Sequence, residues 1–188
     1  MLSGFGTTLY LLLFSGFLGL LLAIVLLLMR ISGKFYLDFP AQIYIYIFRG
    51  TPILVQIFII YYGLPQFEYI QDSVFWVILR EPTGCAVLAL TLNTGAYVSE
   101  ILRGGVLAVN RGLIEAGSAL GMNARHRFIY ITTPIAIRIA LPSYSNDVVS
   151  LLNSTALAST ITITDMTGIA RTIVSKTYAP YEIFVSLA

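Results

Sequence analysis

Polar side chains that could bind a ligand are rare in this sequence and lie inside long apolar runs. Asp147 stands in the apolar stretch 135–163, where a carboxylate is costly unless a cation or water compensates it. A cationic side chain or an ammonium group of a ligand could supply that charge, and so could Arg138 of the same stretch. Our candidates for a substrate pathway are Asn93, Asp147, Asn153, Ser154, Thr155 and Ser159. In membrane helices such groups also bond neighbouring helices or their own backbone, so both interpretations stay open.

Catalytic chemistry has little support in the residue types. His126 is the only histidine and Cys85 the only cysteine, so neither can belong to a cluster of such residues. The sequence also contains no G-x-x-x-x-G-K-[ST] phosphate loop, so we expect any ATP to be bound by a partner. We therefore expect no catalytic residue, no metal site and no cofactor bound by this chain.

The elements that must position these residues are membrane helices, as the composition indicates. The 188 residues are 57% hydrophobic and 11% charged, whereas soluble domains carry about 25% charged residues. The spare apolar surface must face lipid, and the net charge of +2 gives no indication of nucleic acid. We predict an all-α integral membrane protein with a single domain over residues 1–188.

Apolar runs divide the chain into about five predicted spans. The first run has neither a basic start nor a cleavage site, so we predict a retained span rather than a signal peptide. Residues 36–48 are aromatic and suit a membrane interface, with the second span beginning after Arg49. The last run resembles the opening of a fifth span that stops too early to cross. We expect the spans at 9–29, 49–64, 84–98, 135–163 and from 181, an exposed loop with a short helix at 66–81, and a short turn capped by Asp165.

Basic residues set the predicted orientation, because loops on the cytoplasmic side carry an excess of Lys and Arg. With the amino terminus outside, eight basic residues fall on the cytoplasmic side and three outside. The eight are Arg30, Lys34, Arg49, Arg103, Arg111, Arg125, Arg127 and Arg138. This orientation makes residues 103–134 a cytoplasmic loop.

The same loop contains a motif with long and specific spacing. Glu115-Ala116-Gly117 is followed by Gly121 and, after a further loop, by Ile131-Thr132-Thr133-Pro134. This pattern resembles the EAA signature of permease subunits in ATP-binding-cassette (ABC) importers, with Gly117 and Thr133 as departures. The resemblance implies that the loop docks on an ATPase subunit through Glu115, Ala116, Gly117, Ala119, Leu120, Gly121 and Arg125. A small-residue helix ended by a left-handed turn at Gly121 fits this role.

Three further blocks narrow the resemblance to permeases for polar amino acids. These blocks are FRGTPILVQ at 48–56, ALTLNTGAY at 89–97 and SYSNDVV at 143–149, the last resembling permeases for histidine, lysine, arginine and octopine. Arg49 within the first block is either an interfacial anchor or a partner in gating. Glu100 and Arg103, three residues apart, are expected to form a local salt bridge.

What the resemblance implies is a type I ABC importer permease in the bacterial cytoplasmic membrane. Its expected partners are a dimer of ATP-binding subunits that carries ATP and Mg, an identical or paralogous permease, a periplasmic or lipid-anchored binding protein, and membrane lipid. The expected cargo is a basic amino acid or an opine, with glutamine or another polar amino acid as the alternative. An ion-coupled secondary transporter is the alternative from another class, but the sequence shows no internal repeat.

Overall fold

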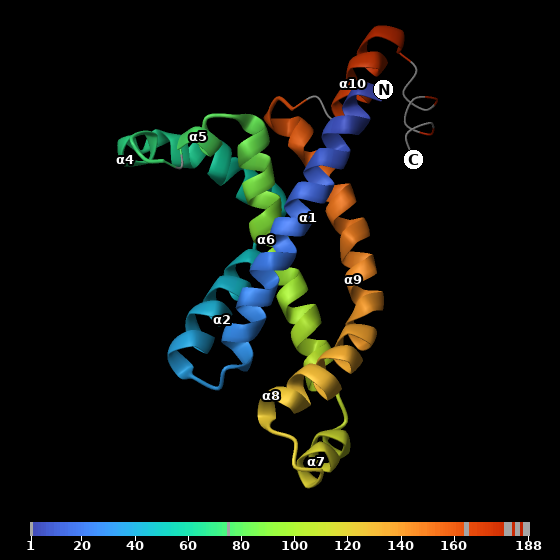
Figure 1. Cartoon of the computed structure of the whole chain (residues 1–188). Coiled ribbons are helices and arrows are strands. Elements are labelled where there is room, and N and C mark those ends of the chain that lie inside the picture. The colour runs from blue at the N-terminus through green and yellow to red at the C-terminus, as the bar shows by residue number, and fades with distance from the viewer. Residues whose placement is uncertain (1, 75, 164–165, 179–181, 183–184, 186–188) are drawn as a thin grey trace.

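Helices make up all the regular structure in the part of the chain that the computed structural model describes, which is residues 2–74, 76–163, 166–178, 182 and 185. Figure 1 shows three long helices, α1, α6 and α9, that run between two ends of the molecule. Helices α7 and α8 lie at one end, and the amino terminus lies with α10 at the other. The all-α prediction is confirmed.

The centre of the molecule is the contact between α1 (Leu2–Ile31) and α6 (Pro82–Leu107). A Cβ atom added to Gly19 of α1 would lie 2.8 Å from Cβ of Thr94, and one added to Gly95 of α6 would lie 2.7 Å from Leu22. Each helix thus offers a glycine to a larger side chain of the other. Small residues bring membrane helices close because packing, rather than release of water, holds them together.

The second apolar segment is a broken helix, and the stretch before the break differs from our expectation. Helix α2 (Phe35–Gly50) is followed by α3 (Ile53–Phe58) and the π-helix η1 (Ile59–Gly63), with a bend of 104° at the break. The apolar run after Arg49 begins as a separate helix at Ile53, as predicted, whereas the aromatic stretch expected at the interface is itself helical. Its buried residues Ala41 and Ile45 lie four apart, which gives α2 an apolar face toward its neighbours.

Helix α6 also continues further than its predicted end near residue 98. The charged residues Glu100 and Arg103 do not close it, because they neutralise each other within the helix. Before α6, the short helices η2 (Leu64–Gln66), α4 (Glu68–Gln71) and α5 (Trp76–Leu79) fill the region predicted as an exposed loop with a short helix. The sequence signal at Glu100 marked an ion pair rather than a helix end.

The segment after α6 folds as a helical hairpin that leads into the third long helix. Helices α7 (Arg111–Ala119) and α8 (Ala124–Arg127) are followed by η3 (Phe128–Thr132), α9 (Thr133–Thr155) and η4 (Ala156–Ile161). The sequence did not predict α10 (Met166–Thr177), which packs on α1. Asp165 and most of 181–188 lie outside the described residues, so the predicted turn cap and fifth span are not described.

Two described helices, α1 and α6, are long and apolar enough to cross a membrane, and the bent pair that starts with α2 raises the number to three. Helix α9 has 23 residues, which is enough length for a span. It carries too many polar side chains to resemble a lipid-facing helix. A helix of this kind is expected to face protein or a water-filled path.

Candidate functional site

The last carbonyl groups of α2 have no amide partner within the helix, so they need other hydrogen-bond donors. Side chains supply them. The hydroxyl of Thr51 donates to the carbonyl oxygen of Ile47 at 2.9 Å, and the hydroxyl of Tyr97 donates to that of Arg49 at 3.4 Å. The carbonyl of Phe48 accepts from the side-chain amides of both Gln56, at 2.8 Å, and Asn93, at 3.3 Å. The break after Gly50 is therefore a capped and defined structure.

Gln56 holds the two sides of the break together. Its amide nitrogen also donates to the carbonyl and the hydroxyl of Thr51, at 3.0 and 2.7 Å, while its oxygen accepts from Asn93 at 3.1 Å. The side chain is buried, so each of these bonds replaces a bond to water that is not available. Sequence reasoning assigned Gln56 no role, although it is the only polar residue between Pro52 and Tyr61.

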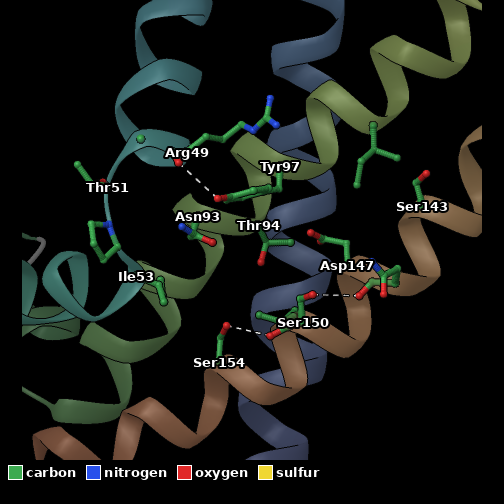
Figure 2. A pocket seen from close by; sticks show the side chains of 15 residues that line it. Arg49, Thr51, Ile53, Asn93, Thr94, Tyr97, Ser143, Asp147, Ser150 and Ser154 are labelled. Carbon is green, nitrogen blue, oxygen red and sulfur yellow. Dashed lines mark hydrogen bonds between the residues drawn. The ribbon is translucent and has the colours of Figure 1, made fainter.

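Arg49 leaves this capped end and extends over α6. Its guanidinium lies over the ring of Tyr97, 5.2 Å from the ring centroid, as Figure 2 shows. This is the distance of a cation–π contact, which is strongest where water is excluded. No carboxylate of the described residues lies within 4.0 Å of Arg49, so its N–H donors stay available. Both predicted roles of Arg49, as an anchor and as a pairing residue, therefore stay open.

A cavity of about 650 Å³, here called cavity A, lies between the break, α6 and α9. Asp147 projects from α9 into this region, and Arg49 faces the same cavity from α2 (Figure 2). Among the described residues, Asp147 has no ion pair or hydrogen-bond partner, and the expected pair with Arg138 is absent. The two residues are nine positions apart on α9, which puts them on opposite faces of the helix.

A polar stripe of α9 forms one wall of cavity A. Ser143, Asp147, Ser150 and Ser154 follow one another at steps of four, three and four residues, so they share one helix face. Ser150 and Ser154 donate to carbonyl oxygens one turn earlier, at 3.2 and 2.9 Å, and their oxygens can still accept from a ligand. The sequence analysis missed Ser143 and Ser150, although this spacing could have identified them.

The six residues predicted for a substrate pathway do not all meet. Cavity A brings together Asn93, Asp147 and Ser154. Thr155 is buried and donates to the carbonyl of Leu152 at 2.6 Å, while Ser159 donates to that of Ala156 at 2.8 Å, both away from the cavity wall. Asn153 is exposed on another face of α9. Asn93 has two roles, because it both caps α2 and lines the cavity.

A compact ionic cluster lies one to two turns further along α6. Arg30 of α1 pairs with Asp38 of α2 and lies 3.6 Å from Glu100, which Arg103 binds through two hydrogen bonds of 2.8 and 2.7 Å. The predicted Glu100–Arg103 salt bridge is confirmed. Because two cations meet two carboxylates, the cluster ties α1, α2 and α6 together without a large unbalanced charge.

The EAA-like motif lies on α7 and its exit. Asn110 caps the start of the helix, accepting from the amide of Gly112 at 2.8 Å. At the end, Gly121 has a φ of +78°, the amide of Met122 donates to Gly117 and that of Gly121 donates to Ser118. These are the two bonds of a Schellman motif, so the predicted left-handed turn at Gly121 is confirmed.

The outer face of this hairpin is exposed. Glu115, Ala116, Ala119, Leu120, Gly121 and Arg125 are all exposed, and Leu120 keeps 83% of its accessible area. Gly117 is different, because it is buried against Ile131 and Arg127, and Arg127 also binds the carbonyl of Met122 at 2.7 Å. A small exposed helix with a prominent leucine, packed against α8 and η3, is suited to contact a partner.

A comparison with known protein families gives a match over almost the whole chain. A family model described as binding-protein-dependent transport system inner membrane component matches residues 11–187. The chain belongs to this family. It is therefore a permease subunit, as the EAA-like motif predicted, and it is an inner membrane component of a transport system.

Relatives within the family carry the names of amino-acid and opine permeases. The octopine transport system permease protein OccM of Rhizobium meliloti is 53% identical over 98% of this chain and 75% of its own length. The nopaline transport system permease protein NocM of Agrobacterium fabrum is 48% identical over 98% of this chain and 77% of its own length. The histidine/lysine/arginine/ornithine transport system permease protein HisM of Escherichia coli K12 is 43% identical over 97% of this chain and 77% of its own length. The predicted resemblance to this permease group is confirmed.

Solved structures agree with the permease fold. A crystal structure of an amino acid ABC transporter with histidines matches with a TM-score of 0.85 and 34% identity, covering 98% of this chain and 82% of that one. The inward-facing MetNI methionine ABC transporter matches with a TM-score of 0.76 and 19% identity, covering 99% of this chain and 87% of that one. This match supports the fold alone. The predicted ABC importer fold is confirmed.

Proposed function

We propose that this chain forms part of the membrane pathway of an ATP-driven importer for basic amino acids or opines. The observation that supports this most directly is the charge pattern of cavity A. Arg49 and Asp147, which have no ion-pair partner in the described part of the chain, line one cavity together with hydroxyl and amide groups.

This pattern complements a zwitterion that carries an extra cation. Arg49 offers a planar fork of N–H donors, which suits the α-carboxylate of an amino acid. Asp147 offers a carboxylate for the α-ammonium or the side-chain cation. A cavity of about 650 Å³ is within the usual range for small-molecule sites. Asn93 and the serine stripe supply neutral partners for the remaining polar atoms.

The relatives support the same cargo class. Their names give the substrates octopine, nopaline, and histidine, lysine, arginine and ornithine. We extend this class to the present chain because a carboxylate, Asp147, lines cavity A and could bind the cation of a basic cargo. Glutamine or another polar amino acid remains the alternative cargo, and an uptake measurement separates the two.

Transport by this chain requires partners that the ABC class supplies. We propose that α7 and the Gly121 turn dock on a dimer of ATP-binding subunits on the cytoplasmic side, and that ATP and Mg bind only to those subunits. The exposed Leu113, Ala116 and Leu120 lie along one face of α7 and its exit, which gives such a docking site an apolar centre. A second permease, identical or related, would complete the pathway, and an external binding protein would deliver the amino acid.

Uptake of labelled arginine in cells with and without this subunit tests the proposal. We expect uptake to depend on the subunit and to be competed by unlabelled lysine or histidine. Competition by glutamine or glutamate alone would discard the basic cargo and keep the transport function. Uptake that is unchanged without the subunit, for every amino acid tested, would contradict the proposed function.

A further inference from the structure

A second cavity of about 720 Å³, here called cavity B, adjoins cavity A. The two share four lining residues, Arg49, Gly50, Thr51 and Tyr97. All four belong to the break after α2 or to the middle of α6. The boundary between the cavities is therefore formed by the capped helix end and the tyrosine that caps it.

The order of residues along the two elements places cavity B nearer to the α7 hairpin. On α2, residues before Arg49 such as Gln42 line cavity B, while residues after Thr51 line cavity A. On α6 the order is reversed, since Asn93 lines cavity A whereas Glu100 and Arg103 line cavity B. Ile101, which lines cavity A, is the exception. Because α6 runs toward α7, a ligand moving from A to B would approach the hairpin.

Tyr97 is fixed at this boundary by two contacts with one residue. Its ring lies under the guanidinium of Arg49, and its hydroxyl donates to the carbonyl oxygen of Arg49. The side chain keeps 36% of its accessible area, so it is not needed to fill the core. A ring held this way between two cavities obstructs passage more than it stabilises the fold.

Arg49 differs from the other arginines of cavity B. Arg30 and Arg103 are bound by Asp38 and Glu100, whereas no carboxylate in the described ranges lies within 4.0 Å of Arg49. Its guanidinium instead lies against the ring of Tyr97. A carboxylate that enters cavity A can therefore compete with the ring for the guanidinium, and an ion pair with bidentate geometry is the stronger contact.

We propose that Arg49 and Tyr97 form a partition between cavities A and B, which the carboxylate of the cargo opens by drawing the guanidinium off the ring. This inference rests on the proposed function for the identity of the cargo. Arg49 then has two states. In one its guanidinium contacts the ring of Tyr97 and the passage is closed, and in the other it binds the carboxylate of the cargo and the passage is open. The two states make passage depend on a bound carboxylate.

The test uses the complete transporter in proteoliposomes loaded with labelled agmatine, which is arginine without the carboxylate that opens the partition, and follows efflux without ATP. With Tyr97→Ala we expect ATP-independent efflux to rise by about twofold to fivefold, because the loss of one solvent-exposed cation–π contact corresponds to roughly that factor. Tyr97→Phe keeps the ring and should stay as tight as the unaltered protein. Efflux from Tyr97→Ala that equals the unaltered level would overturn the partition.

Tyr44 provides the matched control. Its hydroxyl also joins α2 to α6, donating to the carbonyl of Leu92 at 2.7 Å, but it lines neither cavity. Tyr44→Ala should disturb the same helix pair without opening the passage. If Tyr44→Ala leaks as much as Tyr97→Ala, general loosening of α2 and α6 explains the leak and the proposal is wrong.

A labelling experiment tests the partition without reference to cargo or uptake. Gln42 lines cavity B and is exposed, so Gln42→Cys in a Cys85→Ala background gives a single reporter thiol. An impermeant thiol reagent should reach it only from the side of the α7 hairpin, and from both sides once Tyr97→Ala is added. Labelling from both sides before that change would exclude the partition. If arginine uptake fails but this labelling pattern is found, the proposed cargo falls and the partition stands.

Discussion

At the scale of single residues, this chain separates charges that hold the fold from charges that remain available. Arg30, Asp38, Glu100 and Arg103 neutralise one another across three helices. Arg49 and Asp147 have no such partners among the described residues, although both face a cavity in a largely apolar assembly. A single ionised group in such surroundings is expensive to keep. A bound ligand group of opposite charge would offset the free energy of burying each charge.

Asp147→Asn tests this interpretation. The amide keeps the shape but loses the charge, so the apparent affinity for arginine should fall by roughly tenfold to a hundredfold, as for the loss of a charged hydrogen bond worth about 1.5–3 kcal/mol. Uptake of a neutral amino acid such as glutamine, where measurable, should change much less. Concentration-dependent uptake of both amino acids gives the comparison.

The control is Asp72→Asn, which removes an exposed carboxylate from the loop before α5. It should leave arginine uptake unchanged. Equal losses for arginine and glutamine in Asp147→Asn would show that Asp147 serves the fold and not the cargo's cation.

Residue types alone identified part of the candidate site. Asn93, Asp147 and Ser154 stood out because polar groups are rare in apolar runs, and all three line cavity A. Tyr97 and Gln56 could not be identified in this way. The hydroxyl of Tyr97 bonds the carbonyl of Arg49 across 48 residues, and Gln56 bonds Asn93 across 37 residues as well as nearby Phe48 and Thr51. Such a pairing becomes visible only in three dimensions.

At the scale of elements, the contact of α1 with α6 depends on glycine. Gly95→Val should destabilise the protein by about 1–3 kcal/mol, because its first side-chain atom would lie 2.7 Å from Leu22, whose Cγ and Cβ are also close. Thermal unfolding in detergent measures the change. Gly104→Ala on the same helix is the control, since a Cβ there meets nothing within 4 Å. If both variants unfold at the same temperature as the unaltered protein, close packing at Gly95 is not limiting.

The turn after α7 offers a second test at this scale. Gly121→Asp places a negative charge at the carboxyl end of a helix, where it is unfavourable, in an exposed position with nothing within 4 Å. We expect the protein to insert normally but to lose most of the stimulation of ATPase activity by cargo and binding protein. Gly121→Asn also tolerates a positive φ and carries no charge, so it should retain coupling. Normal uptake by Gly121→Asp would contradict the docking role of this turn.

Apolar periodicity and glycine placement predicted most elements, but not their ends. The end of α6 was placed too early because Glu100 and Arg103 were taken as a boundary, whereas they compensate each other inside the helix. The helix before Arg49 was not predicted, because the capping of the α2 end by Asn93 and Tyr97 is not visible locally. Helix boundaries in membranes depend on which partners satisfy the terminal carbonyl groups.

At the scale of the whole molecule, the α7 hairpin and α10 lie at opposite ends (Figure 1). The basic residues predict that the hairpin end is cytoplasmic. A single cysteine at Arg125, in a Cys85→Ala background, should react with an impermeant reagent only in inside-out vesicles. Arg125 is exposed, so failure to react would not come from burial. Labelling in intact spheroplasts, where only the outer face is reachable, would reverse the proposed orientation.

The capped end of α2 also constrains the order in which the chain can assemble. Helix α2 precedes α6 in the sequence, yet two of the donors for its terminal carbonyl groups, Asn93 and Tyr97, belong to α6. During synthesis, Gln56 can bind the carbonyls of Phe48 and Thr51 as soon as α3 emerges, but the carbonyl of Arg49 must wait. Lipid cannot donate a hydrogen bond to this carbonyl before α6 is present. The bent segment is therefore stable within the membrane only after α6 has inserted beside it. The break thus makes biogenesis of this membrane domain cooperative: the second segment is held back until a later one completes it.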